Sequence, residues 1–234
     1  MHSTDRLISR NRVSRWLTVV LILTILASAL GELSRAYPGS DNPLVGLLRF
    51  LRAGFNPSAE QTVNTWLTSV LLLGCALLLL AISTAMRERA WGHWRMLGWL
   101  FIFLSVDEMI SIHERVGDLV SNRIETSGYL LWAWVIPYGI LALVIAVSYV
   151  PFLWRLPPET RWRVILAGAI YVGGALGVEM IEAQIVTGSG SGTREVAMRA
   201  VVEEGLELTG AALFFTVLLR HIARYIPFEV GLRQ

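Results

Sequence analysis

Several stretches of the chain are mainly apolar over 18 or more residues, and this pattern limits the fold more than any other feature. Each stretch is long enough to cross the ~30 Å hydrocarbon core of a bilayer as an α-helix. Hydrophobic residues make up 54% of the 234 residues and charged residues 16%, a more apolar balance than soluble domains show. Short alternating strands are absent from the pattern. The sequence therefore predicts an all-α, polytopic membrane protein.

The apolar stretches and the turn residues between them predict one domain, residues 1–234, built as a six-transmembrane-helix bundle. The expected helices cover residues 16–33, 63–86, 94–114, 129–154, 164–186 and 196–222. In the first external loop, residues 44–52 place Arg49 and Arg52 on one helical face and apolar residues on the other, which predicts a short interfacial helix. A stripe of small residues, Ala169, Gly173 and Gly177, predicts a close contact of the fifth helix with a neighbour.

Residues 16–33 have two interpretations. They follow a polar, arginine-rich segment and fit a retained first helix, but Ala27-Ser28-Ala29 resembles the cleavage site of a signal peptide. The apolar run is long for a signal peptide, which favours the retained helix.

The basic residues predict the orientation of the helices. All 20 are arginines, so a Schiff-base lysine is excluded, and the single Cys75 leaves no disulfide framework and no cysteine metal site. Thirteen arginines fall on the side of the two termini and seven on the other side. This excess predicts cytoplasmic termini in the inner membrane of a bacterium. Because the arginines gather at helix ends, the expected partner is the lipid bilayer, and nucleic acid is not expected.

Acidic residues interrupt three of the apolar stretches, where charge is costly. The third helix carries Asp107, Glu108, His113 and Glu114, the fifth carries Glu179 and Glu182, and the sixth carries Glu203, Glu204 and Glu207. At 1.5 Å per residue, all three groups fall in the outer half of the membrane. The sequence therefore predicts that these acids share one depth.

Spacing along each helix predicts which acids face together. Asp107, Ser111 and Glu114 form one stripe of a straight helix, while Glu179 and Glu182, and Glu203 and Glu207, are pairs three or four residues apart. Each helix can thus direct at least two of these residues toward a common axis. Glu108 and His113 fall on other faces, so His113 is expected at the edge of the site or in a supporting role.

Eight carboxylates in a bilayer would cost roughly 20 kcal/mol if all were charged and unpaired. Bound cations, protonation or a water-filled cavity could relieve that cost. An oxygen-rich set with at most one imidazole favours Fe or Mn and also suits Ca or Mg. Paired glutamates on facing helices are typical of dinuclear carboxylate sites, although the usual Glu-x-x-His motifs are absent here. The expected metal ligands are Asp107, Glu114, Glu179, Glu182, Glu203 and Glu207, with Glu108, Ser111, His113 and Glu204 in secondary roles.

Three functions are open at this point, and whether the chain is an enzyme is among the open questions. The first is a metal-dependent oxidase or hydrolase that acts on a lipid-like substrate. The second is a transporter that moves protons or divalent cations through the same acids. The third is a non-catalytic subunit beside a partner subunit or a second copy of the chain. A transporter would need polar residues leading inward from the acids, and the helices are largely apolar there, which argues mildly against it.

The third helix also carries a resemblance. Phe103-Leu104-Ser105-Val106-Asp107-Glu108, followed by His113-Glu114, resembles a helix of uncharacterised bacterial multi-pass membrane proteins with the pattern F-L-S-x-D-E-x-x-x-x-H-E. The resemblance implies a bacterial, polytopic membrane protein and brings no particular activity.

Overall fold

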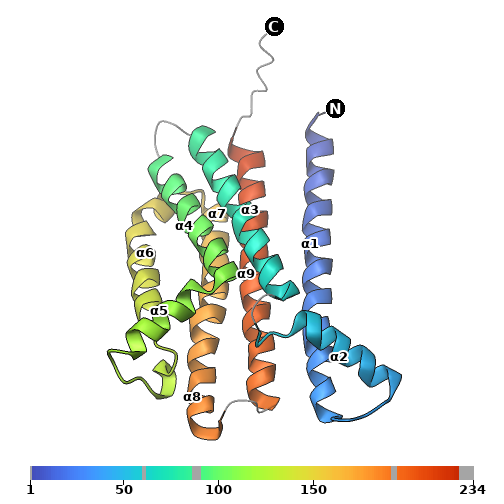
Figure 1. Cartoon of the computed structure of the whole chain (residues 1–234). Coiled ribbons are helices and arrows are strands. Elements are labelled where there is room, and N and C mark those ends of the chain that lie inside the picture. The colour runs from blue at the N-terminus through green and yellow to red at the C-terminus, as the bar shows by residue number, and fades with distance from the viewer. Residues whose placement is uncertain (1, 60–61, 86–90, 191–193, 227–234) are drawn as a thin grey trace.

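The computed structural model describes residues 2–59, 62–85, 91–190 and 194–226 (Figure 1). Helices dominate these ranges, which contain no strand, so the all-α prediction is confirmed. The α-helices are α1 (His2–Glu32), α2 (Pro43–Phe55), α3 (Val63–Ala85), α4 (Trp91–Ile110), α5 (Ile112–Ser121), α6 (Val135–Arg155), α7 (Pro158–Val172), α8 (Glu179–Ser189) and α9 (Arg194–Tyr225). Shorter elements are η1 (Leu33–Ala36), η2 (Gly128–Leu130) and η3 (Gly173–Val178), of which η3 is a π-helix.

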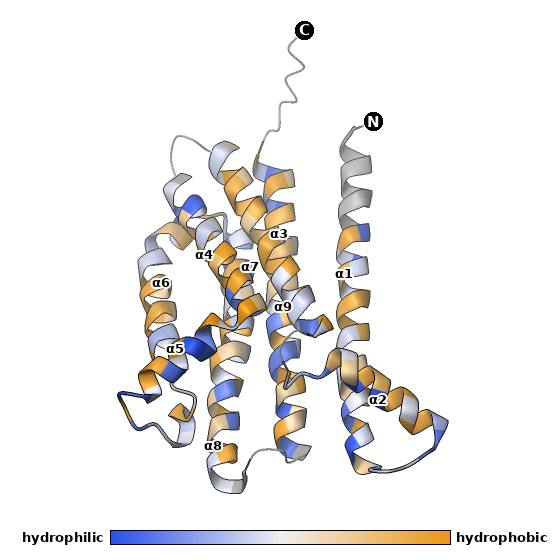
Figure 2. Cartoon of the chain, viewed as in Figure 1, coloured by the Kyte–Doolittle hydropathy of each residue, from blue (hydrophilic) through white to orange (hydrophobic). Residues whose placement is uncertain are grey.

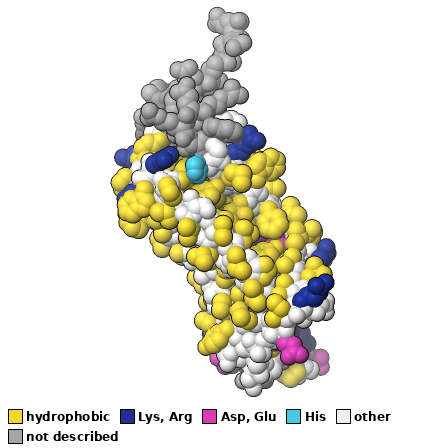
Figure 3. Space-filling view, turned by 90° about the vertical axis from the view of Figure 1, so that its left-hand side faces the viewer, with side chains coloured by type: hydrophobic (Ala, Val, Ile, Leu, Met, Phe, Trp, Pro, Cys, Tyr) yellow, Lys and Arg dark blue, Asp and Glu magenta, His cyan; other side chains and the backbone are white. Residues whose placement is uncertain are grey.

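The described helices fit a protein that crosses the membrane several times. Five are long and apolar enough to do so, and the bent pair of α4 and α5 makes a sixth if it counts as one span. Hydrophobic side chains cover the middle of the molecule, and charged side chains gather toward its two ends (Figure 3). The predicted polytopic bundle is therefore confirmed, as is the short helix in the first loop, which is α2.

The helix boundaries agree with the prediction where an apolar run determines them. They differ from the prediction where turn residues determine them. The sixth predicted helix, 196–222, lies within α9, while the fifth, 164–186, is part of a longer run of α7, η3 and α8. The fourth predicted helix begins at Val135 and not at residue 129, because the residues before Val135 form the short 3-10 helix η2 and bends. Met86, the predicted end of the second helix, lies outside the described residues.

The prediction of one straight helix over residues 94–114 is wrong. Ser111 has a φ of 52°, in the left-handed region that residues other than glycine seldom adopt. The chain breaks there, and α4 and α5 meet at 78°. Asp107, Ser111 and Glu114 therefore cannot form the single stripe expected of one straight helix.

Packing joins the helices into a bundle whose ends differ. α3 packs against α4 and α9, α7 packs against α9, and α1 packs against α2 and α9. The first turns of α1 and the last turns of α9 lie at one end of the bundle, which we call the terminal end (Figure 1). A buried core that includes Ile82, Trp94, Phe152 and Leu218 fills the bundle toward this end.

Two glycines bring α7 and η3 against α9. A Cβ atom on Gly210 would lie 2.7 Å from the backbone nitrogen of Tyr171, and one on Gly174 would lie 2.9 Å from the Cβ of Leu206. The prediction that the stripe of Ala169, Gly173 and Gly177 makes this contact is wrong, because a Cβ on Gly173 or Gly177 would meet nothing within 4 Å. The close contact thus comes from Gly174 of this run and from Gly210 on α9.

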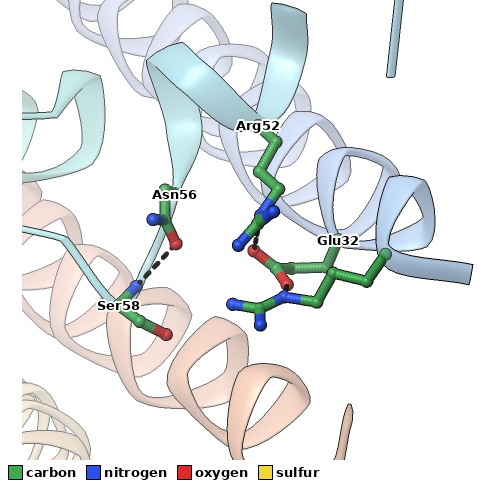
Figure 4. Close-up of polar contacts among 5 residues, drawn as sticks. Glu32, Arg52, Asn56 and Ser58 are labelled. Atoms are coloured by element: carbon green, nitrogen blue, oxygen red, sulfur yellow. Dashed lines mark hydrogen bonds and ion pairs between the residues drawn. The ribbon is translucent and has the colours of Figure 1, made fainter. Parts of the chain in front are cut away.

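Glu32 of α1 is a buried acid that sequence reasoning missed. Its carboxylate accepts hydrogen bonds from the Nε atoms of Arg35 and Arg52, the second at 3.3 Å, and so ties α2 to α1 (Figure 4). In the loop after α2, the backbone N–H of Ser58 donates to the side chain of Asn56 at 3.1 Å. Glu32 is satisfied by two arginines, so it has a structural explanation and does not belong to the acid site.

Candidate functional site: an acidic cavity between α4 and α9

A cavity of about 1180 Å³ lies between α4, α5, α6, α7, α8 and α9. Hydrophilic residues on α5, α8 and α9 gather in the part of the bundle away from the terminal end (Figure 2). The part of the cavity that the acids of these helices line is called the acidic end. All the acids singled out in the sequence line the cavity, as does His113, whereas Ser111 does not. The lining acids are Asp107, Glu108, Glu114, Asp118, Glu179, Glu182, Glu203, Glu204 and Glu207.

Asp107 is buried and holds three polar contacts. Its Oδ1 accepts from the backbone N–H of His113 at 2.7 Å and from the hydroxyl of Tyr138 at 3.0 Å. Its Oδ2 lies 3.3 Å from Nδ1 of His113. The expectation that His113 points away from Asp107 is wrong, because the break at Ser111 turns the chain back toward α4. Asp107 therefore joins α4, α5 and α6 at one point.

Aromatic side chains flank this point, and sequence reasoning missed them. The ring centroids of His113 and Trp134 are 4.9 Å apart, and those of Trp134 and Tyr138 are 5.4 Å apart. Trp134 also donates its indole N–H to Glu179 at 3.3 Å. Both Trp134 and Tyr138 carry a polar group that needs a hydrogen-bond partner when buried. This need is the sequence signal that could have identified them as site residues.

A carboxyl pair connects α8 with α9. The side chains of Glu179 and Glu203 lie close enough to interact with each other. Glu203 also interacts electrostatically with Glu182 and Glu207, and Glu179 interacts with Glu114. Acids from α5, α8 and α9 thus meet around this pair.

Glu182 offers an acceptor that the described residues leave unused. The residue is 8% exposed and lines the cavity, and its Oε2 has no hydrogen-bond partner among them. Arg199 attracts Glu182 electrostatically and donates one hydrogen bond to Glu195 at 3.1 Å, and its buried Nε has no hydrogen-bond partner among the described residues. A buried acceptor without a donor is costly, and Nε of Arg199 or a donor on a bound group would satisfy it.

The π-helix η3 places the acids of α8 against those of α9. It ends immediately before Glu179, and π-helical turns inside α-helices are often found at functional sites. A Cβ on Gly174 would lie 3.0 Å from the backbone oxygen of Glu203 and 3.2 Å from Cγ of Glu207. The absent side chain therefore lets the two acid-bearing segments approach each other.

The described side chains do not form a metal-binding group. Within the described ranges, no three His, Cys, Asp or Glu side chains are placed to hold a metal ion together. The Glu179–Glu203 pair nevertheless offers two carboxyl groups side by side. Mg²⁺ commonly binds through one or two carboxylates and keeps several waters, and this pair matches that pattern. The dinuclear arrangement remains a prediction without support from these side chains.

Toward the terminal end the cavity becomes apolar. Its lining there includes Trp94, Leu97, Phe101, Phe152 and Val164. The rings of Trp94 and Phe152 meet edge to face, with centroids 5.0 Å apart, and Phe101 stacks on Phe214 of α9. These contacts belong to the buried core, so the cavity reaches the aromatic core at this end.

Comparison with known proteins places the chain in a family. No curated protein and no solved structure matches it. A family model described as "Domain of unknown function (DUF8692)" matches residues 15–222, which include every acid of the site. The chain belongs to this DUF8692 family.

Proposed function

We propose that the protein binds a divalent cation at the acidic end of the cavity and acts as an enzyme on a lipid-like substrate in the bilayer. The observation that carries this proposal is the cavity, in which acids of α4, α5, α8 and α9 lie around one space that continues into an apolar region. Pockets that combine an apolar lining with a few convergent polar groups are typical binding sites.

Glu179 and Glu203 would hold the cation, since their side chains interact across α8 and α9. Glu182 and Glu207 interact electrostatically with Glu203 and would be the further ligands. Fe or Mn is favoured by the oxygen-rich set with one imidazole nearby, and Ca or Mg also suits it. A bound cation would polarise a substrate oxygen or activate water for hydrolysis, and Fe or Mn would also support oxidation. Asp107, which also accepts a hydrogen bond from Tyr138, holds His113 beside the proposed cation position.

A transporter for protons or divalent cations is the second candidate. The acids of α8 and α9 that line the cavity support it, since such groups carry protons and cations in transporters. The apolar, aromatic lining at Trp94 and Phe152 argues against it, because a transport path for ions needs polar groups at this end. We place the acidic end toward the outer leaflet of the inner membrane and the termini in the cytoplasm, on the arginine excess alone.

Elemental analysis of the full-length protein, purified without oxygen, tests the cation site. We expect wild-type protein to carry close to one Fe or Mn per chain and Glu203→Gln to lose it, because glutamine keeps the size of the side chain but removes a charged ligand. Glu195→Gln is the matched control, since Glu195 lies on the same helix, is exposed and is not among the lining residues. Equal metal content in the two variants, or none in wild type, would contradict the proposal.

A further inference from the structure

A second, smaller cavity of about 230 Å³ lies at the terminal end of the bundle, between the first turns of α7 and the last turns of α9. Its lining residues are Glu159, Thr160 and Arg163 of α7 and Val217, Arg220, His221, Arg224 and Tyr225 of α9. None of them lines the larger cavity. Oγ1 of Thr160 lies 3.3 Å from Nδ1 of the buried His221, so the two helices meet directly at this cavity.

The lining of this terminal cavity carries an excess of positive charge. It contains three arginines and one glutamate, which leaves two positive charges uncompensated. Glu159 accepts hydrogen bonds from Arg163, at 2.7 Å, and from Arg224. Arg220 makes no ion pair or hydrogen bond within the described part of the chain. Guanidinium groups bind phosphate oxygens through strong, charge-assisted hydrogen bonds, so the lining favours a phosphate group.

The start of α7 adds a second preference for an anion. Pro157 precedes this helix, and no side chain caps its first turn. The N–H groups of a first turn have no partner within the helix, and the helix dipole places partial positive charge on them. Glu159 and Thr160 belong to this turn and line the terminal cavity. Phosphate groups commonly bind at such helix ends.

Aromatic side chains typical of a membrane border lie beside the terminal cavity. Trp154 and Trp162 are exposed, and tryptophan is enriched where a bilayer meets water. The guanidinium carbon of Arg161 lies 4.4 Å from the ring centroid of Trp154 and 5.5 Å from that of Trp162. Trp162 follows Thr160 by two residues in the first turns of α7. The cavity is therefore within reach of lipid head groups as well as of molecules in water.

We propose that the terminal cavity binds a phosphate monoester, carried either by a lipid head or by a small soluble molecule. Arg163, Arg220 and Arg224 donate hydrogen bonds to the phosphate oxygens, and the first turn of α7 faces the same group. The site lies at the opposite end of the bundle from the acidic end. The proposal therefore does not rest on the cation site or on enzyme activity.

Calorimetric titration of the full-length protein in a neutral detergent tests the proposal. Dihexanoylphosphatidic acid and dihexanoylglycerol are the probes, because they share their chains and differ by the phosphate. We expect the phosphatidic acid to bind at least about tenfold more tightly, since hydrogen bonds between arginine and a charged oxygen are strong. Equal binding of the two lipids would overturn the proposal.

Glycerol phosphate, which carries the phosphate without chains, distinguishes the two sources. If it binds as tightly as dihexanoylphosphatidic acid, the ligand is a soluble ester. If it binds at least about tenfold more weakly, the chains contribute and the ligand is a lipid. Either result supports the phosphate site when the binding depends on Arg220.

Two arginine variants separate this site from the general charge of the membrane border. Arg220→Gln removes one lining charge and should weaken binding of dihexanoylphosphatidic acid about tenfold, while thermal unfolding stays close to that of wild type. Arg155→Gln removes the same charge from the exposed end of α6, which is not part of the lining, and should leave binding unchanged. Equal loss of binding in the two variants would overturn the proposal.

Glu159→Gln should strengthen binding, a result that a misfolded protein cannot give. The substitution removes the acid of the lining and with it the repulsion of the phosphate, and it releases Arg163 and Arg224 from their ion pairs. We expect dihexanoylphosphatidic acid to bind about fivefold more tightly than to wild type. Unchanged or weaker binding would overturn the proposal.

Discussion

Replacing Asp107 with alanine is expected to lower the free energy of unfolding by about 3 kcal/mol, one of the two largest single effects in this chain. The substitution removes the acceptor for the backbone N–H of His113 and the hydroxyl of Tyr138, and the contact with His113 Nδ1. These groups are partly buried, so water replaces the acceptor poorly. Denaturant-induced unfolding in detergent micelles measures the change.

Two variants serve as controls for Asp107. Asp107→Asn keeps an oxygen at Oδ1 and should cost about 1 kcal/mol or less. Asp118→Ala changes an exposed acid of α5 and should alter stability by no more than about 0.5 kcal/mol. If Asp107→Ala is as stable as Asp118→Ala, the three contacts do not hold α4, α5 and α6 together.

Gly210→Leu is expected to destabilise the bundle by at least about 3 kcal/mol and to lower the yield of monodisperse protein sharply. A Cβ at this position would lie 2.7 Å and 2.8 Å from the backbone nitrogen and Cα of Tyr171, which cannot rotate away as a side chain can. α7 and α9 would have to separate, and the acids of α8 and α9 would move apart with them. Size-exclusion chromatography and thermal unfolding measure the effect.

Gly168→Leu is the matched control, because it adds the same side chain to α7 at a position where a Cβ meets nothing within 4 Å. We expect it to be as stable as wild type or slightly more stable, since leucine favours helix more than glycine does. Equal yields and melting temperatures for Gly210→Leu and Gly168→Leu would show that α7 and α9 do not approach as closely as described.

The fold class and the inward position of several acids could be predicted because each follows from a local cost. An apolar run in a bilayer must satisfy its backbone by forming a helix, so hydropathy located the spans. A carboxylate in such a helix is costly unless it faces other polar groups inside the bundle. Inward faces were therefore expected for Glu179, Glu182, Glu203 and Glu207, and all four line the cavity.

The detailed geometry could not be predicted, because it depends on backbone features without a clear local signal. Ser111 gives no sign of positive φ, and the bond from His113 N–H to Asp107 that accompanies it joins two helices. The π-helix η3 changes the register before Glu179, so the face of the acids could not be extrapolated from α7. Tyr138 was overlooked because an aromatic in an apolar run reads as packing, and its hydroxyl finds a partner only in the folded chain.

Anomalous diffraction at the manganese absorption edge, on crystals of the wild-type protein grown with Mn²⁺, tests the central claim most directly. The claim is that acids from separate helices surround one cation place in the cavity. We predict an anomalous peak between the carboxyl groups of Glu179 and Glu203, within reach of Glu182 or Glu207. A peak at the surface only, or crystals that contain manganese but show none in the cavity, would contradict the claim.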